Sequence, residues 1–239
     1  MRRALAFLTP LGGARSPSPA SLAWFPVVGG LLGLALGALW WLAAQIWPPA
    51  VAAAVVVATD LGLTGLLHLD GLVDAADGLL PPLDRQRRLD VMADPGAGAF
   101  GVGTAVVVLL LRWTAVAALR PDPWVLGGLW CASRTAMAVV AASVPYARSS
   151  GLASAFIPGG TPPRRRPAMV LAGGSLAALA LAGAGSGPGG LAAVAAVALG
   201  AAAVVGLAWR RLGGFTGDVL GAAGLVGETT GLLVAAARW

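Results

Sequence analysis

Three aspartates between His68 and Gly78 have a spacing that could do chemistry. Asp70, Asp74 and Asp77 fall within roughly 60° of one another when the segment is placed on a helix of about 3.6 residues per turn. Carboxylates on one helix face repel each other, so the arrangement is costly unless a cation lies among them. A divalent metal with oxygen ligands, Mg²⁺ in particular, meets that need and makes phosphate chemistry the first hypothesis. The alternative is a solvated helix end.

Arginines and another aspartate follow this segment closely. Arg87 and Arg88 are candidates for the phosphate oxygens that a metal leaves free, because guanidinium groups bind phosphate as bidentate donors. Asp94, just before Pro95, either joins the acidic site or serves as a turn or cap residue. His68 is either a base or a histidine with ordinary partners at a membrane interface. Together these residues favour a metal-bound diphosphate.

A second polar segment lies near the end of the chain. Three glycines surround Thr216 and Asp218, which is typical of a tight loop that opens a helix. Asp218 either caps that helix or completes the metal site from a distant part of the sequence. Glu228 falls deep in an apolar run, where an unpaired carboxylate is costly, so it is a functional candidate by default.

The composition places these residues in a membrane protein. Only 11% of the residues are charged, whereas a soluble domain has about 25%. The sequence therefore predicts an all-α, polytopic helical bundle of about seven transmembrane helices, with residues 1–239 as one domain and the lipid bilayer as a partner. No nucleic-acid partner is expected. A single histidine and the single Cys131, expected to be a small buried hydrophobe, argue against a zinc site.

Seven apolar runs are long enough to span a bilayer. A turn signal around Pro188 separates the fifth run from the sixth and makes that boundary the least defined. The runs are Trp24–Trp47, Ala50–Leu67, Ala99–Leu119, Trp124–Val144, Ala168–Gly187, Gly190–Trp209 and Val219–Ala237.

Arginine placement predicts the orientation of the bundle. With the N-terminus in the cytoplasm, three loops rich in arginine lie on that side, and the opposite side receives only Arg120 and Arg238. The positive-inside rule favours this topology. It places the N-terminus and the acidic site at the cytoplasmic face of the bacterial inner membrane. The arginines on that side are Arg2, Arg3, Arg15, Arg85, Arg87, Arg88, Arg148, Arg164, Arg165, Arg166, Arg210 and Arg211.

Two arginines inside apolar runs need partners. Arg134, with Ser133 beside it, either reaches a phosphate or forms a structural ion pair with Glu228. Arg112 has Asp60 as a candidate partner, since both are predicted within spans. The sequence leaves both alternatives open.

The combined motifs resemble the cobalamin synthase family, adenosylcobinamide-GDP ribazoletransferases. The resemblance rests on His-Leu-Asp-Gly-Leu-Val-Asp-Ala-Ala-Asp-Gly at 68–78 and Gly-Gly-Phe-Thr-Gly-Asp at 213–218. Shorter pieces at 24–29, 92–101, 133–134 and 221–222 occur in the family's order. Ala93 stands where the family often has a basic residue. A lone pair of spaced aspartates would not be specific, but this combination is.

The resemblance implies a Mg²⁺-dependent integral membrane transferase. It would join adenosylcobinamide-GDP to α-ribazole or its 5′-phosphate, release GMP and form adenosylcobalamin or its phosphate. It implies metal or diphosphate roles for Asp70, Asp74 and Asp77, with Asp94 and Asp218 in the same site. A homo-oligomer or a complex with other cobalamin-assembly enzymes is left open. The remaining candidates for phosphate or substrate binding are Arg87, Arg88, Ser133, Arg134, Thr216, Glu228 and His68.

In the expected reaction, a ribose hydroxyl attacks the phosphorus on the cobinamide side of the diphosphate. A carboxylate that is not bound to metal would accept the hydroxyl proton, and Asp94 is favoured over Asp218. One rival is another membrane phosphotransferase or prenyltransferase with an aspartate-rich Mg²⁺ site. The other is a transporter whose ion path uses the intramembrane charges, although no inverted repeat is apparent.

Overall fold

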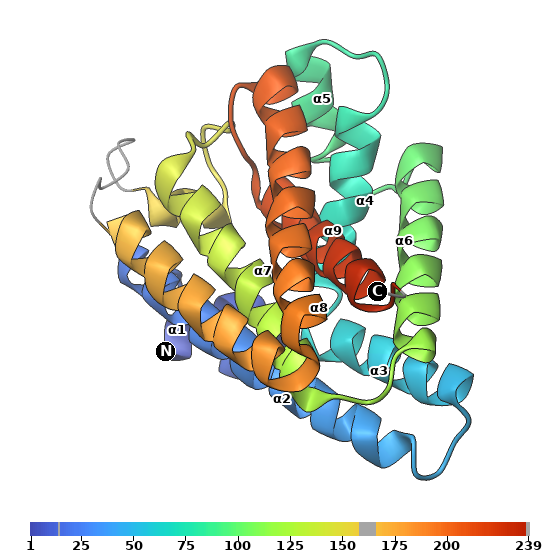
Figure 1. Cartoon of the computed structure of the whole chain (residues 1–239). Coiled ribbons are helices and arrows are strands. Elements are labelled where there is room, and N and C mark those ends of the chain that lie inside the picture. The colour runs from blue at the N-terminus through green and yellow to red at the C-terminus, as the bar shows by residue number, and fades with distance from the viewer. Residues whose placement is uncertain (14, 158–165, 238–239) are drawn as a thin grey trace.

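The computed structural model describes residues 1–13, 15–157 and 166–237, and these residues fold into helices without a β-strand (Figure 1). The predicted all-α class is therefore confirmed. The helices are α1 (Arg2–Leu8), η1 (Pro10–Gly12), η2 (Pro19–Trp24), α2 (Phe25–Ala43), α3 (Pro49–Leu63), α4 (Leu67–Leu79), α5 (Arg85–Val91), α6 (Ala99–Ala118), α7 (Pro123–Ser143), η3 (Leu152–Phe156), α8 (Arg166–Leu212) and α9 (Gly217–Ala235).

The helices are long and apolar enough for a multi-pass membrane protein. Among the described residues, five could cross a bilayer, and a sixth span results if α3 and α4 count as one bent pair. The element α8 contains the fifth and sixth predicted runs as two helical arms, which diverge from a sharp bend in Figure 1. The arms separate at Gly187, whose φ of 55° and ψ of −132° are not helical, and Pro188 follows. The turn signal was therefore placed correctly.

The second predicted run is not a straight span. It breaks after Leu63, and α4 leaves α3 at 87°. Gly65 and Leu66 both have positive φ, 58° and 62°, a conformation that a leucine adopts only under strain. The Thr64 hydroxyl donates to the Asp60 carbonyl at 2.8 Å and so satisfies an acceptor at the end of α3. Because of this bend, the helix that carries the aspartates, α4, begins at Leu67 and is separate from α3.

The centre of the bundle is built around α7 and α9. α7 packs between α2 and α8, while α9 packs against α8 and α4. A Cβ at Gly33 of α2 would overlap the Leu126 carbonyl of α7, so the glycine permits the close approach of these two helices. Large apolar side chains fill the interior, among them Trp40, Trp130 and Phe215.

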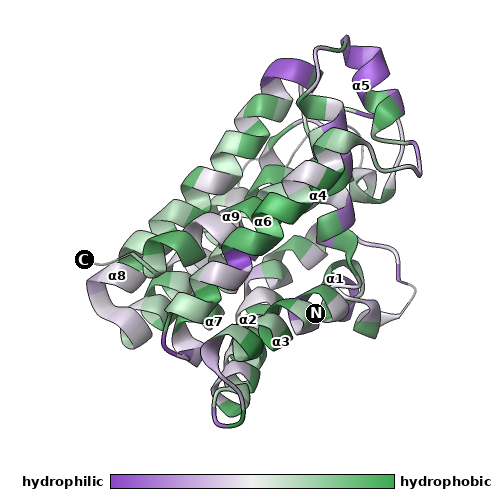
Figure 2. Cartoon of the chain, turned by 90° about the vertical axis from the view of Figure 1, so that its right-hand side faces the viewer, coloured by the Kyte–Doolittle hydropathy of each residue, from purple (hydrophilic) through white to green (hydrophobic). Residues whose placement is uncertain are grey.

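The arginine-bearing segments meet at one end of the molecule. Arg85 donates to the carbonyls of Leu212 and Ala147, both at 2.9 Å, and thereby joins α5 to the end of α8 and to the loop after α7. Arg211 reaches back to the carbonyl of Leu79 at the end of α4. Figure 2 shows the hydrophilic colouring gathered towards the end that carries α5, whereas the rest of the ribbon is mostly hydrophobic. These contacts agree with a topology in which the arginine-bearing loops lie on the same side of the membrane.

Candidate functional site

The two acidic segments lie together where α4 crosses α9. A Cβ at Gly71 would stand 2.9 Å from the Asp218 carbonyl oxygen, so only glycine lets the helices approach this closely. The charges of Asp70 and Asp218 act on Asp74, and that of Asp70 acts on Asp218. Asp70 is exposed, and the other two are partly buried. Residues from distant parts of the chain therefore form one acidic group, which we call the acidic cluster: Asp70, Asp74 and Asp218.

Asp218 lies in the first turn of α9 without capping it. The cap is Thr216, whose hydroxyl oxygen accepts from the Val219 backbone N–H at 3.2 Å. The same hydroxyl donates to the Asp218 carboxylate at 3.1 Å. The predicted tight loop before the last helix is confirmed, and its capping task falls to a residue other than Asp218.

Arg148 brings a cation to the acidic cluster. One of its terminal nitrogens lies 3.1 Å from the Asp218 carboxylate, and its charge also acts on Asp74. The backbone beside it is fixed, because Ala147 N–H donates to the Phe215 carbonyl at 2.8 Å and Phe215 N–H to Pro145 at 2.9 Å. The loop after α7 is thus bound to the loop that leads into α9.

A cavity of about 490 Å³ opens at the acidic cluster. Asp70 and Asp218 line it together with Arg148, and α1 and the segment after it form one wall. Burial raises the pKa of the Tyr146 phenol in this lining, so the group remains a neutral hydrogen-bonding partner. The lining combines polar side chains with a larger number of apolar residues and glycines: Ala6, Phe7, Thr9, Pro10, Arg15, Pro17, Thr64, Gly65, Leu67, His68, Asp70, Gly71, Met137, Tyr146, Arg148, Gly151, Leu152, Ala153, Gly217, Asp218, Leu220 and Gly221.

Asp77 shares the helix face of the cluster but has other partners. Its two carboxylate oxygens accept from the backbone N–H groups of Gly98 at 2.7 Å and Gly101 at 2.8 Å. These bonds satisfy donors at the start of α6, where a negative charge is also favourable. The geometry gives Asp77 a helix-capping task, and its metal role stays a prediction.

The residues after α4 point elsewhere as well. Arg88 is buried and donates to the carbonyls of Gly78 and Leu79 at 2.7 and 3.1 Å, which closes the end of α4. Arg87 is exposed. Asp94 is exposed and accepts from Gly96 N–H at 2.8 Å, as expected for the turn alternative, and it is outside the cavity lining. The phosphate and base roles of these residues stay predictions.

The polar side chains within the bundle form a separate group, which we call the buried charge network. Arg112 contacts Asp60 at 2.6 Å and Glu228 at 3.1 Å, and Arg134 contacts Glu228 at 2.6 Å. Trp130 donates to Asp60 at 2.9 Å. The structural pairing that the sequence left open for both arginines is the arrangement observed.

Ser133 and His68 border the buried charge network. The Ser133 hydroxyl donates to the Gly224 carbonyl and accepts from Arg134. His68 Nδ1 lies 3.5 Å from Arg134, while Nε2 has no hydrogen-bond partner. Since His68 also lines the cavity, it lies between the buried charge network and the cavity beside the acidic cluster.

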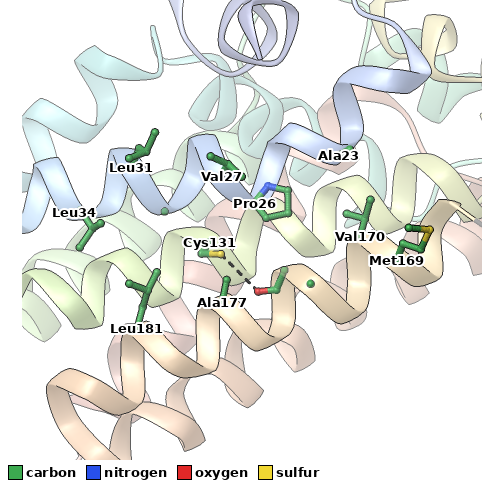
Figure 3. A pocket seen from close by; sticks show the side chains of 13 residues that line it. Ala23, Pro26, Val27, Leu31, Leu34, Cys131, Met169, Val170, Ala177 and Leu181 are labelled. Atoms are coloured by element: carbon green, nitrogen blue, oxygen red, sulfur yellow. Dashed lines mark hydrogen bonds between the residues drawn. The ribbon is translucent and has the colours of Figure 1, made fainter.

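A second hollow lies between α2, α7 and the first arm of α8 (Figure 3). Its volume is about 440 Å³, and its lining, which includes Leu31, Met169 and Leu181, carries no charged side chain. The Cys131 thiol in this lining donates to the Gly174 carbonyl at 3.6 Å. Cys131 is 2% exposed, as expected for a small buried hydrophobe. Acid–base or metal chemistry therefore belongs to the other cavity.

The acidic cluster suits a divalent cation shared with a ligand. Among the described residues, no three His, Cys, Asp or Glu side chains are close enough to form a complete metal site. Mg²⁺ is commonly held by one or two carboxylates together with substrate phosphates and water, so a partial protein shell fits it. Asp70 and Asp74 supply hard oxygen ligands, and the Arg148 nitrogen that pairs with Asp218 without a hydrogen bond fits an anionic oxygen.

The sequence placed Arg148 on the cytoplasmic side but did not pair it with Asp218. The pair could have been predicted from the topology, because both residues lie at the same predicted membrane face. The wall formed by Phe7 and Arg15 was missed as well. Nothing in a short apolar N-terminal helix distinguishes a cavity wall from a membrane anchor.

Comparison with known proteins agrees with the motifs. The family model described as cobalamin-5-phosphate synthase matches residues 1–236. An adenosylcobinamide-GDP ribazoletransferase of Bradyrhizobium diazoefficiens is 37% identical, covering 99% of this chain and 93% of the relative. Proteins of the same name from Chlorobium phaeovibrioides (39%; 90% and 85%) and Ectopseudomonas mendocina (37%; 98% and 97%) are also similar. No solved structure matches. The chain belongs to the cobalamin-5-phosphate synthase family.

Proposed function

We propose that this chain is an adenosylcobinamide-GDP ribazoletransferase. It joins adenosylcobinamide-GDP to α-ribazole or its 5′-phosphate, releases GMP, and forms adenosylcobalamin or its phosphate. Family membership over residues 1–236 and the name shared by the relatives support the activity. The observation in the structure that carries it is the grouping of Asp70, Asp74 and Asp218 with Arg148 beside a cavity that Asp70, Asp218 and Arg148 line.

The proposed reaction needs little covalent work from the protein. A ribose hydroxyl oxygen forms a bond to the phosphorus on the cobinamide side, and the bond from that phosphorus to the GMP oxygen breaks. Asp70 and Asp74 would hold Mg²⁺, which when bound neutralises the diphosphate and stabilises the charge of the leaving GMP. Asp218 takes the hydroxyl proton, since it lines the cavity and Asp94 does not.

The size of the cavity favours separate places for the two substrates, with one inside the cavity and the other at its mouth. A volume of 490 Å³ lies within the range of about 300–1,000 Å³ typical of small-molecule sites. A nucleoside such as α-ribazole fits this volume, with its base against Phe7, Met137 and Leu152. A corrin macrocycle is much larger, so it stays at the mouth and presents its diphosphate to the acids.

The proposed location is the bacterial inner membrane, with the cavity at the cytoplasmic face. The arginine-bearing segments support it, because α5, the loop after α7 and the end of α8 meet at one end of the bundle. The positive-inside rule assigns that end to the cytoplasm. Nucleotides and Mg²⁺ are available on that side.

The test is a reaction with the purified, detergent-solubilised protein. Adenosylcobinamide-GDP and α-ribazole are supplied with Mg²⁺, and GMP and the corrinoid product are measured by chromatography. GMP release must depend on the acceptor and stop when EDTA removes the metal. If no GMP appears, while a prenyl diphosphate or a lipid alcohol is turned over, the chain has the rival transferase activity. Corrinoid flux through liposomes without product would indicate a transporter.

A further inference from the structure

The acidic cluster is under-neutralised by the protein itself. Asp70, Asp74 and Asp218 bring three carboxylates to the crossing of α4 and α9, and Arg148 is the cation paired there at 3.1 Å. Both partners of that ion pair are only partly covered, with 24% of the Arg148 and 20% of the Asp218 side chain exposed. Because both side chains reach solvent, water screens part of their attraction, and the pair can be exchanged for other partners.

The guanidinium of Arg148 has donors left to use. Its buried terminal nitrogen lies near Asp218, yet no hydrogen bond of acceptable geometry is formed. An arginine offers five N–H donors in a planar fork, and burying one without an acceptor is costly. His68 Nε2 in the same cavity lining is also buried without a partner. Two unsatisfied polar atoms at one cavity indicate that a polar ligand completes it.

The backbone holds Arg148 at this place independently of the ion pair. The bonds between residues 145–147 and Phe215 fix its attachment point relative to α9. Arg85 adds a bond to the Ala147 carbonyl. Arg148 can therefore change its side-chain partner while its Cα stays in place.

Three other arginines at this end of the bundle are bonded to the backbone. Arg85, Arg88 and Arg211 donate to backbone carbonyls of Leu212, Gly78 and Leu79, and these bonds connect helices. Arg134 is paired with Glu228 inside the bundle. The cavity lining holds two arginines: Arg15 is exposed, and Arg148 is the one paired with an acid of the cluster, with a buried nitrogen that makes no hydrogen bond.

We infer that Arg148 is a phosphate-binding residue that occupies the acidic cluster until a metal-bound diphosphate arrives. When the metal takes the carboxylates, Arg148 leaves Asp218 and its fork binds the diphosphate oxygens. This exchange gives the cluster a cation in both states and leaves the Asp218 carboxylate without its ion-pair partner. The inference rests on the proposed function for the identity of the diphosphate.

Binding measurements without turnover test the exchange. Mn²⁺ binding to the purified protein is followed by electron paramagnetic resonance, and binding of magnesium pyrophosphate and of adenosylcobinamide-GDP with Mg²⁺ by equilibrium dialysis. Arg148→Gln removes the competing cation, so Mn²⁺ should bind about two- to fivefold tighter. Both diphosphates should bind about tenfold or more weakly, because a hydrogen-bonded charge is lost.

Two further variants keep the test decisive. Arg210→Gln, a matched change at an exposed position of the same end, should alter neither affinity. Arg148→Lys keeps the charge but not the fork, so Mn²⁺ affinity should match the wild type while diphosphate binding is weakened. It carries the test if Arg148→Gln does not fold.

Unchanged diphosphate affinity in both Arg148 variants would overturn the inference, and so would Mn²⁺ binding that is weaker in Arg148→Gln. If the wild type binds magnesium pyrophosphate through Arg148 but does not bind adenosylcobinamide-GDP, the proposed function fails and the phosphate role of Arg148 stands.

Discussion

The buried charge network and the acidic cluster solve the same electrostatic problem in different ways. In the network, Arg112 and Arg134 face Asp60 and Glu228, so the charges cancel within the protein, and all four side chains are at most 4% exposed. In the acidic cluster, three carboxylates share one arginine beside a cavity. Buried ionic groups persist when they are paired, so the network is complete by itself, whereas the cluster requires a further cation.

The difference shows that the depth of a charged residue in the bundle does not by itself indicate a functional site in this chain. Glu228 and Arg134 looked functional because charges deep in a bilayer are costly. In the structure they pair with each other, and the network connects α3, α6, α7 and α9. The under-neutralised charges lie at the end of the bundle instead. Net local charge at a cavity therefore indicates a site better than depth does.

The largest effect is expected from Asp74→Asn. Asp74 is the member of the acidic cluster on which the charges of Asp70 and Asp218 both act. Losing a preorganised charge contact in phosphoryl transfer lowers turnover by about 100-fold or more. GMP release is measured alongside thermal unfolding in detergent, which should be unchanged. Asp90→Asn, an exposed matched change, should keep full activity. Near-normal Mg²⁺-dependent turnover by Asp74→Asn would remove the aspartate–metal hypothesis.

Glu228→Gln should break the other region instead. The change leaves Arg112 and Arg134 inside the bundle with one charged partner, Asp60, between them. Removing one partner of a buried ion pair costs about 3–5 kcal/mol. Thermal unfolding in detergent should show a large loss, and whatever folds should still bind Mn²⁺. Unchanged stability with lost metal binding would instead place Glu228 in the active site.

Asp77→Asn separates the two tasks on the face of α4. The asparagine keeps one acceptor oxygen for two N–H donors, Gly98 and Gly101, so the start of α6 is weakened. The expected cost is about 1–2 kcal/mol in unfolding free energy, with less loss of turnover than in Asp74→Asn. Equal loss of turnover and of Mn²⁺ binding in the two variants would support the metal role predicted for Asp77.

Features of the fold and the site that depend on residues close together in the sequence could be predicted, and those that depend on distant residues could not. Helix periodicity placed Asp70, Asp74 and Asp77 on one face, and glycine and proline placed the turn at Gly187, because these signals are local. Apolar length did not predict the bend after Leu63, since nothing in a hydropathy average reports a leucine with positive φ. The hydrogen bonds of Asp77 to Gly98 and Gly101 depend on tertiary approach, which one sequence does not show.

The smallest effect is expected from Asp94→Ala, which decides the identity of the base. Asp94 is exposed and makes one turn hydrogen bond, so stability should change by no more than about 0.5 kcal/mol. Because Asp94 is outside the cavity lining and Asp218 is within it, turnover should stay within about threefold of the wild type, whereas Asp218→Asn should lose about 100-fold or more. Both rates are measured as GMP release at saturating acceptor. If Asp94→Ala loses turnover as severely as Asp218→Asn while Mn²⁺ and diphosphate affinities are unchanged, Asp94 is the base and its loop closes on the cavity when substrate binds.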